Sequence, residues 1–96
     1  MLDLILSLPL ITDQVPIISQ STTVYLPVST KQSKNQNCVT YIAKNTTGQS
    51  VRNVYVNRRN TQGTISKSFL TTSLAAGKTK TFESCNNSFV NVEAKQ

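Results

Sequence analysis

Short runs of β-branched and aromatic residues recur along this chain, and turn-forming residues separate them. Two such runs, residues 38–44 (CVTYIAK) and 51–57 (VRNVYVN), flank the polar stretch NTTGQ. Val, Ile, Tyr and Thr suit a pleated, half-buried surface, and Gly48 can adopt the positive φ that a tight turn requires. The pattern predicts a β-hairpin over residues 38–57, around which the rest of the chain is arranged.

Further strands are predicted on both sides of this hairpin. One covers residues 22–26, and Pro27 restricts it to a sheet edge or a strand end. The others cover residues 64–70 (TISKSFL), 79–84 (TKTFES) and 88–94 (SFVNVEA). Because turn signals recur at short intervals and no helical pattern is convincing, the sequence predicts an all-β fold, a small antiparallel β-sandwich.

The core is predicted from the large apolar members of these runs. In residues 64–70, Ile65, Lys67 and Phe69 share one face of the strand, and its two apolar members are assigned to the core. Alternation is imperfect in the two central runs, so the buried face of the hairpin stays open. The predicted core residues are Val39, Tyr41, Ile42, Val54, Val56, Ile65, Phe69, Leu74, Phe82, Phe89 and Val92.

Residues 1–18 carry a different pattern, in which leucine occupies every second position from residue 2 to residue 10. This period predicts an extended segment with a leucine face. A helix over residues 2–8 is the alternative, and Pro9 and Pro16 prevent a longer one. The run is too short and too interrupted to span a bilayer, so it must fold onto its own body or lie against a partner. The residues expected to dock onto a partner are Leu2, Leu4, Leu6, Leu8, Leu10 and Ile11.

Three segments follow from these patterns. Residues 1–28 form an apolar N-terminal arm with an edge strand. Residues 29–37 (STKQSKNQN) contain no apolar side chain and are predicted to be a polar linker. Residues 38–96 form the sandwich body.

Composition indicates a thin core and a basic body. Hydrophobic residues make up 38% of the chain and charged residues 15%, with a net charge of +6. Residues 31–82 contain all but one of the basic residues and no acid, and such a body can attract an anionic partner such as nucleic acid. Arg52, Tyr55, Arg58 and Arg59 are the candidate patch for it. Because the other bases are scattered, only a weak contact is expected.

Cys38 and Cys85 are the two cysteines. A bridge between them would stabilise the fold by about 4 kcal/mol in the chain-entropy model. Two buried free thiols are the alternative, since free cysteine behaves as a small hydrophobe. The N-terminus lacks the basic region of a secretory signal and has Asp3 in its place, so no signal is expected.

The residue types argue against catalysis. The chain has no histidine to serve as a general base, and no catalytic residue, metal site or cofactor is expected. The three glycines stand alone in separate turns, so no phosphate-binding loop is formed. The four carboxylates are spread over the chain, which disfavours a catalytic pair: they are Asp3, Asp13, Glu83 and Glu93.

The order NTTGQ, VRNVYV and LAAGKTKTF resembles the small immunoglobulin-like β-sandwich modules of bacterial surface and adhesin proteins. The resemblance covers residues 38–94 and implies an immunoglobulin-like or jelly-roll-like sandwich. The chain has no Trp and no tyrosine corner before Cys85, so the antibody-type pattern is absent. The resemblance implies no ligand.

These features lead to three hypotheses of function. The first is a non-enzymatic structural subunit of a large assembly, a minor or decorating capsid protein of a bacterial virus. It would be located in the virion, oligomeric, and bound to other subunits through residues 1–18. The second is a secreted or cell-surface immunoglobulin-like binding or adhesion module, which a bridge between Cys38 and Cys85 would favour. The third is weak nucleic-acid binding through the basic body.

Overall fold

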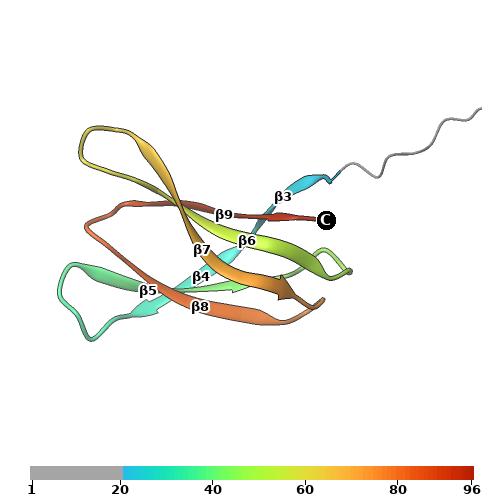
Figure 1. The fold of residues 1–96 in the computed structure, drawn as a ribbon. Coiled ribbons are helices and arrows are strands. Elements are labelled where there is room, and N and C mark those ends of the chain that lie inside the picture. Colours follow the sequence, from blue (N-terminus) through green and yellow to red (C-terminus); the bar gives the residue numbers. More distant parts are fainter. Residues whose placement is uncertain (1–20) are drawn as a thin grey trace, which may run out of the picture.

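The computed structural model describes residues 21–96, and in this range the chain forms seven β-strands and no helix (Figure 1). No helix in this range is long and apolar enough to cross a membrane. The strands are β3 (Thr23–Leu26), β4 (Val28–Gln32), β5 (Cys38–Lys44), β6 (Val51–Arg59), β7 (Ile65–Leu74), β8 (Thr79–Cys85) and β9 (Phe89–Lys95).

The strands form two sheets that face each other. One sheet has four strands in the order β3-β9-β6-β7, and the other has three in the order β4-β5-β8. All neighbouring strands are antiparallel. Tyr41 of β5 stacks on Phe89 of β9 with ring centroids 4.3 Å apart, so side chains from both sheets meet between them. The predicted antiparallel β-sandwich is confirmed for the described residues, and the N-terminal arm lies outside them.

The chain changes sheets at Pro27. β3 ends one residue before this proline and β4 begins one residue after it, in the other sheet. Because proline has no N–H to donate to a ladder, it suits the point at which the strand leaves its first sheet. β4 is an edge strand that pairs with β5 from Val28↔Ala43 to Gln32↔Val39.

The position of β4 corrects the predicted linker over residues 29–37. Residues 29–32 belong to a strand, although every one of them is exposed. An edge strand with most of its surface in water needs few apolar side chains, so its composition resembles that of a loop. The polar stretch therefore shows where the strand lies in the sheet rather than where the sandwich begins.

The predicted hairpin over residues 38–57 is wrong. β5 and β6 follow each other along the chain, but they belong to different sheets and do not pair. The loop between them is held on the β7–β8 corner by fully buried Asn45, whose amide nitrogen donates to the carbonyl of Leu74 at 2.8 Å. Gly48 in this loop has φ 86°, as the turn prediction requires. The turn exists, but it joins two layers of the sandwich.

A β-bulge in β6 explains why the alternation of its sequence is imperfect. Val51, Val54 and Val56 are at most 1% exposed, although strict period two would place the first of them on the opposite face. The pairing with β9 shifts register between Arg52 and Tyr55, and Asn53 within this interval has φ 52°. The extra residue of the bulge brings all three valines to the core.

Small aliphatic side chains fill the core. Of the predicted core residues, Val54, Val56, Leu74 and Val92 are buried. The buried apolar residues are Leu26, Ala43, Val51, Val54, Val56, Leu74, Val92 and Ala94. The apolar residues packed partly buried against them are Val24, Val28, Leu70, Phe82 and Phe89. No fully buried aromatic residue is present in the described range, which agrees with the expected thin core.

The assignment of Ile65 and Phe69 to the core is wrong. Their side chains are 44% and 59% exposed on the outer face of the four-stranded sheet. Lys67 lies between them on the same face, and its charge indicates that this face is the one in contact with water. The predicted core residues Val39, Tyr41 and Ile42 on β5 are only partly buried.

Both ends of the described chain lie at the same end of the sandwich (Figure 1). Thr23 at the start of β3 pairs with Lys95 at the end of β9. The backbone N–H of Gln96 donates to the carbonyl of Thr22 at 2.9 Å. The two ends of the described chain therefore lie side by side.

Candidate functional site

A row of three aromatic rings and one carboxylate crosses the outer face of the four-stranded sheet. Tyr25 of β3 pairs with Glu93 of β9, Glu93 with Tyr55 of β6, and Tyr55 with Phe69 of β7. Directly paired residues point to the same face of a sheet. Tyr25 is 63% exposed, and the rings of Tyr55 and Phe69 meet edge to face with centroids 5.7 Å apart. Tyr25 and Phe69, at the two ends of this row, are among the four large hydrophobic residues that are exposed in the described range.

Glu93 in this row is buried, although it faces away from the core. One carboxylate oxygen accepts a hydrogen bond from the Asn57 amide at 2.8 Å, and the other lies 3.0 Å from the Lys67 ammonium. The hydrogen bond from Asn57 lowers the pKa of Glu93, burial opposes this, and the charges of Lys67 and Lys95 lower the pKa further. The Lys67 ammonium also lies 5.4 Å from the centroid of the Tyr55 ring. These contacts join Glu93, Asn57 and Lys67 into one polar centre within the aromatic row.

Asn57 is the second buried polar residue of this centre. Its amide nitrogen also donates to the side-chain oxygen of Asn91 at 2.7 Å. Its own amide oxygen is buried and accepts no hydrogen bond from residues 21–96. Glu93 is the titratable partner of Asn57, and both of its carboxylate oxygens are already bonded, one to Asn57 and the other to Lys67. These bonds join β6, β7 and β9 across the outer face of the sheet and so stabilise it.

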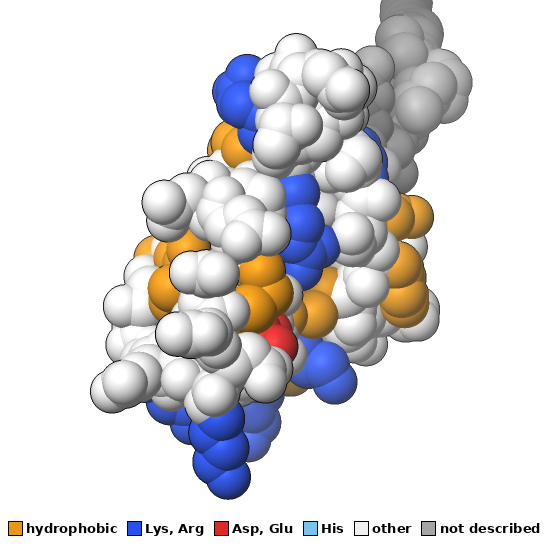
Figure 2. Space-filling view, turned by 90° about the vertical axis from the view of Figure 1, so that its left-hand side faces the viewer, with side chains coloured by type: hydrophobic (Ala, Val, Ile, Leu, Met, Phe, Trp, Pro, Cys, Tyr) orange, Lys and Arg blue, Asp and Glu red, His pale blue; other side chains and the backbone are white. Residues whose placement is uncertain are grey.

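The structure does not gather the candidate anion-binding residues into one patch. Arg52 lies at the start of β6 and Arg58 near its end, about 20 Å apart along the strand. Arg52 donates to Ser21 at 3.0 Å, and Tyr55 belongs to the aromatic row. Figure 2, which faces the end where β8 turns into β9, shows Lys and Arg side chains at separate places with an acidic side chain among them.

Arg58 closes this end of the sandwich. Its guanidinium donates to the Ser84 hydroxyl at 3.0 Å and to the Glu83 carbonyl at 2.9 Å, and lies 5.9 Å from the centroid of the Phe82 ring. Arg59 donates to the carbonyl of Gly63 at 3.4 Å. Arg58 is half-buried and makes two short hydrogen bonds, whereas Arg59 is exposed and makes a single long one, so Arg59 is the better placed of the two for an anion.

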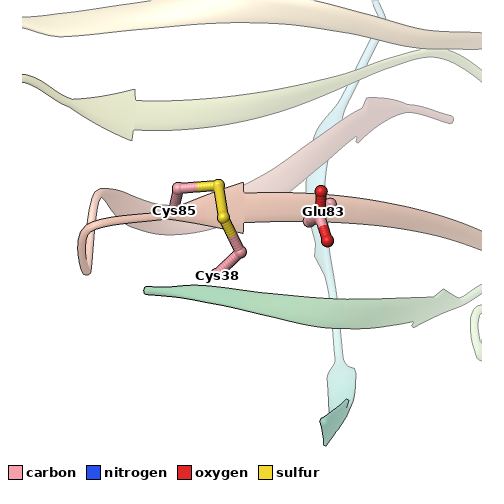
Figure 3. A group of neighbouring side chains, drawn as sticks. All are labelled: Cys38, Glu83 and Cys85. Carbon is pink, nitrogen blue, oxygen red and sulfur yellow. A yellow bond between two sulfur atoms is a disulfide. The ribbon is translucent and has the colours of Figure 1, made fainter. Parts of the chain in front are cut away.

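Cys38 and Cys85 form a disulfide that joins the start of β5 to the end of β8 (Figure 3). The two residues are direct partners in the three-stranded sheet, with Cα atoms 3.9 Å apart. Of the two alternatives that the sequence leaves open, the bridge is the one observed. It lies within one sheet and does not cross the core.

Glu83 lies beside this disulfide, and one of its carboxylate oxygens is within 4.8 Å of both sulfur atoms, so the three groups resemble a metal site (Figure 3). The sulfur atoms are bonded to each other, so neither provides the thiolate that a metal ion would need. Glu83 is exposed and accepts hydrogen bonds from the Ser33 hydroxyl and from the Asn35 amide, the latter at 2.9 Å. The Ser33 bond, followed by the Asn35 bond, lowers the pKa of Glu83.

An open hollow of about 370 Å³ lies next to the disulfide. It contains an arginine, amide and hydroxyl side chains, and no carboxylate. These groups can form hydrogen bonds with a ligand, but they include no general base or activated nucleophile. The lining residues are Arg59, Asn60, Thr61, Cys85, Asn86, Asn87 and Ser88.

Some of the predicted site residues lie outside the described range, and two exposed residues of β7 were predicted to lie in the core. The docking residues of the arm, from Leu2 to Ile11, precede residue 21, so their role stays a prediction. Phe69 and Ile65 were assigned to the core. The signal that could have placed them on the surface is Lys67, which shares their face.

Three comparisons with known proteins, by family model, by curated sequence and by solved structure, found no match to this chain. The resemblance of residues 38–94 to immunoglobulin-like modules therefore stays a prediction.

Proposed function

We propose that this chain is a non-enzymatic, protein-binding β-sandwich module of a secreted or cell-surface protein. The observation that carries the proposal is the Cys38–Cys85 disulfide. Disulfides persist in oxidising compartments and on cell or virion surfaces, and they are rare in the reducing cytoplasm. A small domain whose buried core contains only Val, Leu and Ala gains stability from such a bridge.

The non-enzymatic part of the proposal is supported by where the described acids lie. Glu83 belongs to the three-stranded sheet and Glu93 to the four-stranded sheet, and both point away from the core. A hydrolytic pair of carboxylates needs both groups within several ångström in one cleft. The histidine that most acid–base sites use does not occur in the chain.

The protein-binding part is supported by the exposed side chains of the four-stranded sheet. Ile65 and Phe69 are each more than 40% exposed, and both lie on its outer face along the edge strand β7. Contiguous exposed apolar surface indicates an interaction site, and aromatic residues are enriched in interface cores.

The second candidate is a minor or decorating capsid protein of a bacterial virus, in which the same module would bind neighbouring subunits. It is favoured by the apolar segment over residues 1–18, which needs a partner. A surface-exposed disulfide is compatible with a virion as well.

The location can be tested by counting thiols in the protein taken from its native source. Free cysteines are alkylated before any reduction, and the mass of the intact protein is then measured. Cys38 and Cys85 are expected to be unmodified. A reagent that does not cross membranes, applied to the intact source, is expected to label the surface lysines of the protein. If both cysteines are alkylated, the protein resides in a reducing compartment, and the proposal is wrong.

A further inference from the structure

Within residues 21–96 the two sheets of the sandwich have four edge strands, β3, β7, β4 and β8, and these edges differ in how well they are protected. Natural sheets protect their edges with charged side chains, with proline, or by keeping the edge strand short. β3 has four residues and is followed by Pro27. β4 is exposed along almost its whole length and contains Lys31. β8 contains Lys80 and Glu83 and ends at the disulfide. These three edges therefore disfavour pairing with another strand.

β7 contains no proline, and its one irregularity is the register shift against β6 between Val54 and Tyr55. Among the strands of residues 21–96 it is the longest, with ten residues, and within this range it pairs only with β6. Its single charged residue is Lys67, whose ammonium lies 3.0 Å from Glu93 on β9. Because β6 separates β7 from β9, this lysine extends over the sheet and away from the free edge. A long edge without charge is the arrangement that accepts a further strand.

Apolar side chains flank the β7 edge on both faces of its sheet. Phe69 and Ile65 are exposed on the outer face. Leu70 on the inner side and Phe82 on the neighbouring edge strand β8 are only partly buried. A strand added along β7 would cover the outer pair with one of its faces and the inner pair with the other. Apolar residues on both of its faces would be buried by such an addition.

The chain contains a segment with this pattern. Residues 2–11 place leucine at every second position, and they include Ile5 and Ile11 among the intervening residues. Period two is the pattern of a strand, and leucine on one face with isoleucine on the other suits an edge that is apolar on both sides. Asp3 is the single charge of this segment, and it has the opposite sign to the basic body.

The length of the connection favours the segment of a second molecule. β3 runs antiparallel to β7, so a segment antiparallel to β7 would end at the far end of the sheet from the start of β3. Residues 12–20 would then have to span about 36 Å, from a strand of about 30 Å and four strand spacings of about 19 Å in total, because β7, β6 and β9 lie between the added strand and β3. Nine residues reach at most about 32 Å when fully extended. A second molecule is free of this limit.

From these observations we propose that the free edge of β7 is the docking site for residues 2–11 of a second copy of this chain, which add to the sheet as an antiparallel strand. This inference rests on one part of the proposed function, namely that the chain binds protein, and the bound protein is here a second copy of the same chain. Strand addition pairs the backbone groups of both partners. Pro9 has no N–H to donate, so its nitrogen has to face away from β7. The apolar side chains beside the edge select the leucine pattern.

The oligomeric state of the full chain and of three variants tests the docking. The edge variant carries Ile65→Lys and Phe69→Lys, and the arm variant carries Leu4→Asp and Leu8→Asp. The matched control is Tyr25→Lys, since this residue is as exposed as Phe69 but lies on the opposite edge of the same sheet. Light scattering after size-exclusion chromatography is expected to give at least twice the monomer mass of 10.6 kDa for the wild type and the control. Both other variants are expected at the monomer mass.

A mixing experiment provides the decisive measurement. The edge variant keeps an intact arm, and the arm variant keeps an intact β7 edge, so the two are expected to form a one-to-one dimer when mixed. Circular dichroism of each variant shows whether the body is folded, and the arm variant leaves the whole described domain unchanged. A monomeric wild type, an arm variant that still associates, a monomeric Tyr25→Lys control, or folded variants that do not combine would each overturn the docking. An oxidised monomer that binds another protein would leave the proposed function standing.

Discussion

Asn45→Ala removes the side chain that holds the β5–β6 loop against the end of β7. Asn45 is fully buried, and its amide nitrogen donates to the carbonyls of Gln49 at 2.6 Å and Leu74 at 2.8 Å. Its amide oxygen accepts hydrogen bonds from the backbone and the hydroxyl of Thr47, at 3.0 and 2.7 Å. All four positions of the amide at which hydrogen bonds form are therefore used.

The magnitude follows from which of these partners can reach water after the substitution. The Leu74 carbonyl is buried where Asn45 meets it, and leaving it unpaired costs about 1–3 kcal/mol. The Thr47 and Gln49 groups are closer to solvent, so their lost bonds add about 1 kcal/mol together. The expected loss is about 2–4 kcal/mol from a domain whose total stability is about 5–15 kcal/mol. The melting temperature is expected to fall by at least about 8 °C.

Urea unfolding of the oxidised protein, followed by circular dichroism, measures this loss. Asn60→Ala is the matched control, because exposed Asn60 also organises a loop, accepting hydrogen bonds from the N–H groups of Gln62 and Thr64 at 2.9 Å each. Water can replace those bonds, so the control is expected to lose less than about 1 kcal/mol. If Asn45→Ala and Asn60→Ala lose the same unfolding free energy, burial does not set the cost of removing the hydrogen bonds of Asn45, and the expected difference is refuted.

Four further predictions follow from the structure. The pKa of Glu93 is lowered in the folded state, so its contribution to stability is present at neutral pH and is lost as the pH falls from about 5 through the folded-state pKa. Glu93→Gln should therefore flatten the dependence of the unfolding free energy on pH, and an unchanged slope would contradict this. Gly48→Val should lower the free energy of unfolding by about 1–3 kcal/mol. Gly48→Asn should lower it less, because no atom lies within 4 Å of the added carbon and only the positive φ opposes a side chain. Equal melting temperatures of the two variants would show that the positive φ does not decide which residue fits at position 48. Reduction of the Cys38–Cys85 bridge should lower the unfolding free energy by about 4 kcal/mol, and a melting curve unaffected by reductant would show that the bridge constrains nothing. Binding to single-stranded nucleic acid should be weak and fall steeply with salt, and tight binding at physiological salt would move the basic body to the centre of the function.

The strands could be predicted from the sequence more readily than their partners. Runs of Val, Ile, Tyr and Thr marked β5, β6 and β9, because their composition reflects local burial. The pairing of β5 with β8 rather than with β6 depends on where the β5–β6 loop is held. Buried Asn45 provides that attachment, and in the sequence it looks like any other residue of a polar turn. Tertiary contacts of this kind cannot be derived from local pattern.

The candidate surface was missed for a related reason. Ile65 and Phe69 were assigned to the core because large apolar residues are usually buried. Only Lys67 on the same face argued against this assignment. The bulge at Asn53 likewise disguised the inward face of β6, since one extra residue reverses the alternation that a sequence analysis relies on.

The adjacency of the two chain ends has a mechanical consequence. A pulling force applied at residues 22 and 96 would meet the hydrogen bonds between β3 and β9 one after another, beginning with the bond from Gln96 to Thr22. The domain would open like a zipper at low force, because each bond is loaded alone. In the oxidised protein the extension stops at the bridge, and the 47 residues of separation between Cys38 and Cys85 stay outside the path of the load. Tension would thus release β3, β4 and β9, which lie outside the bridged segment, and would keep β5 to β8 from being drawn out.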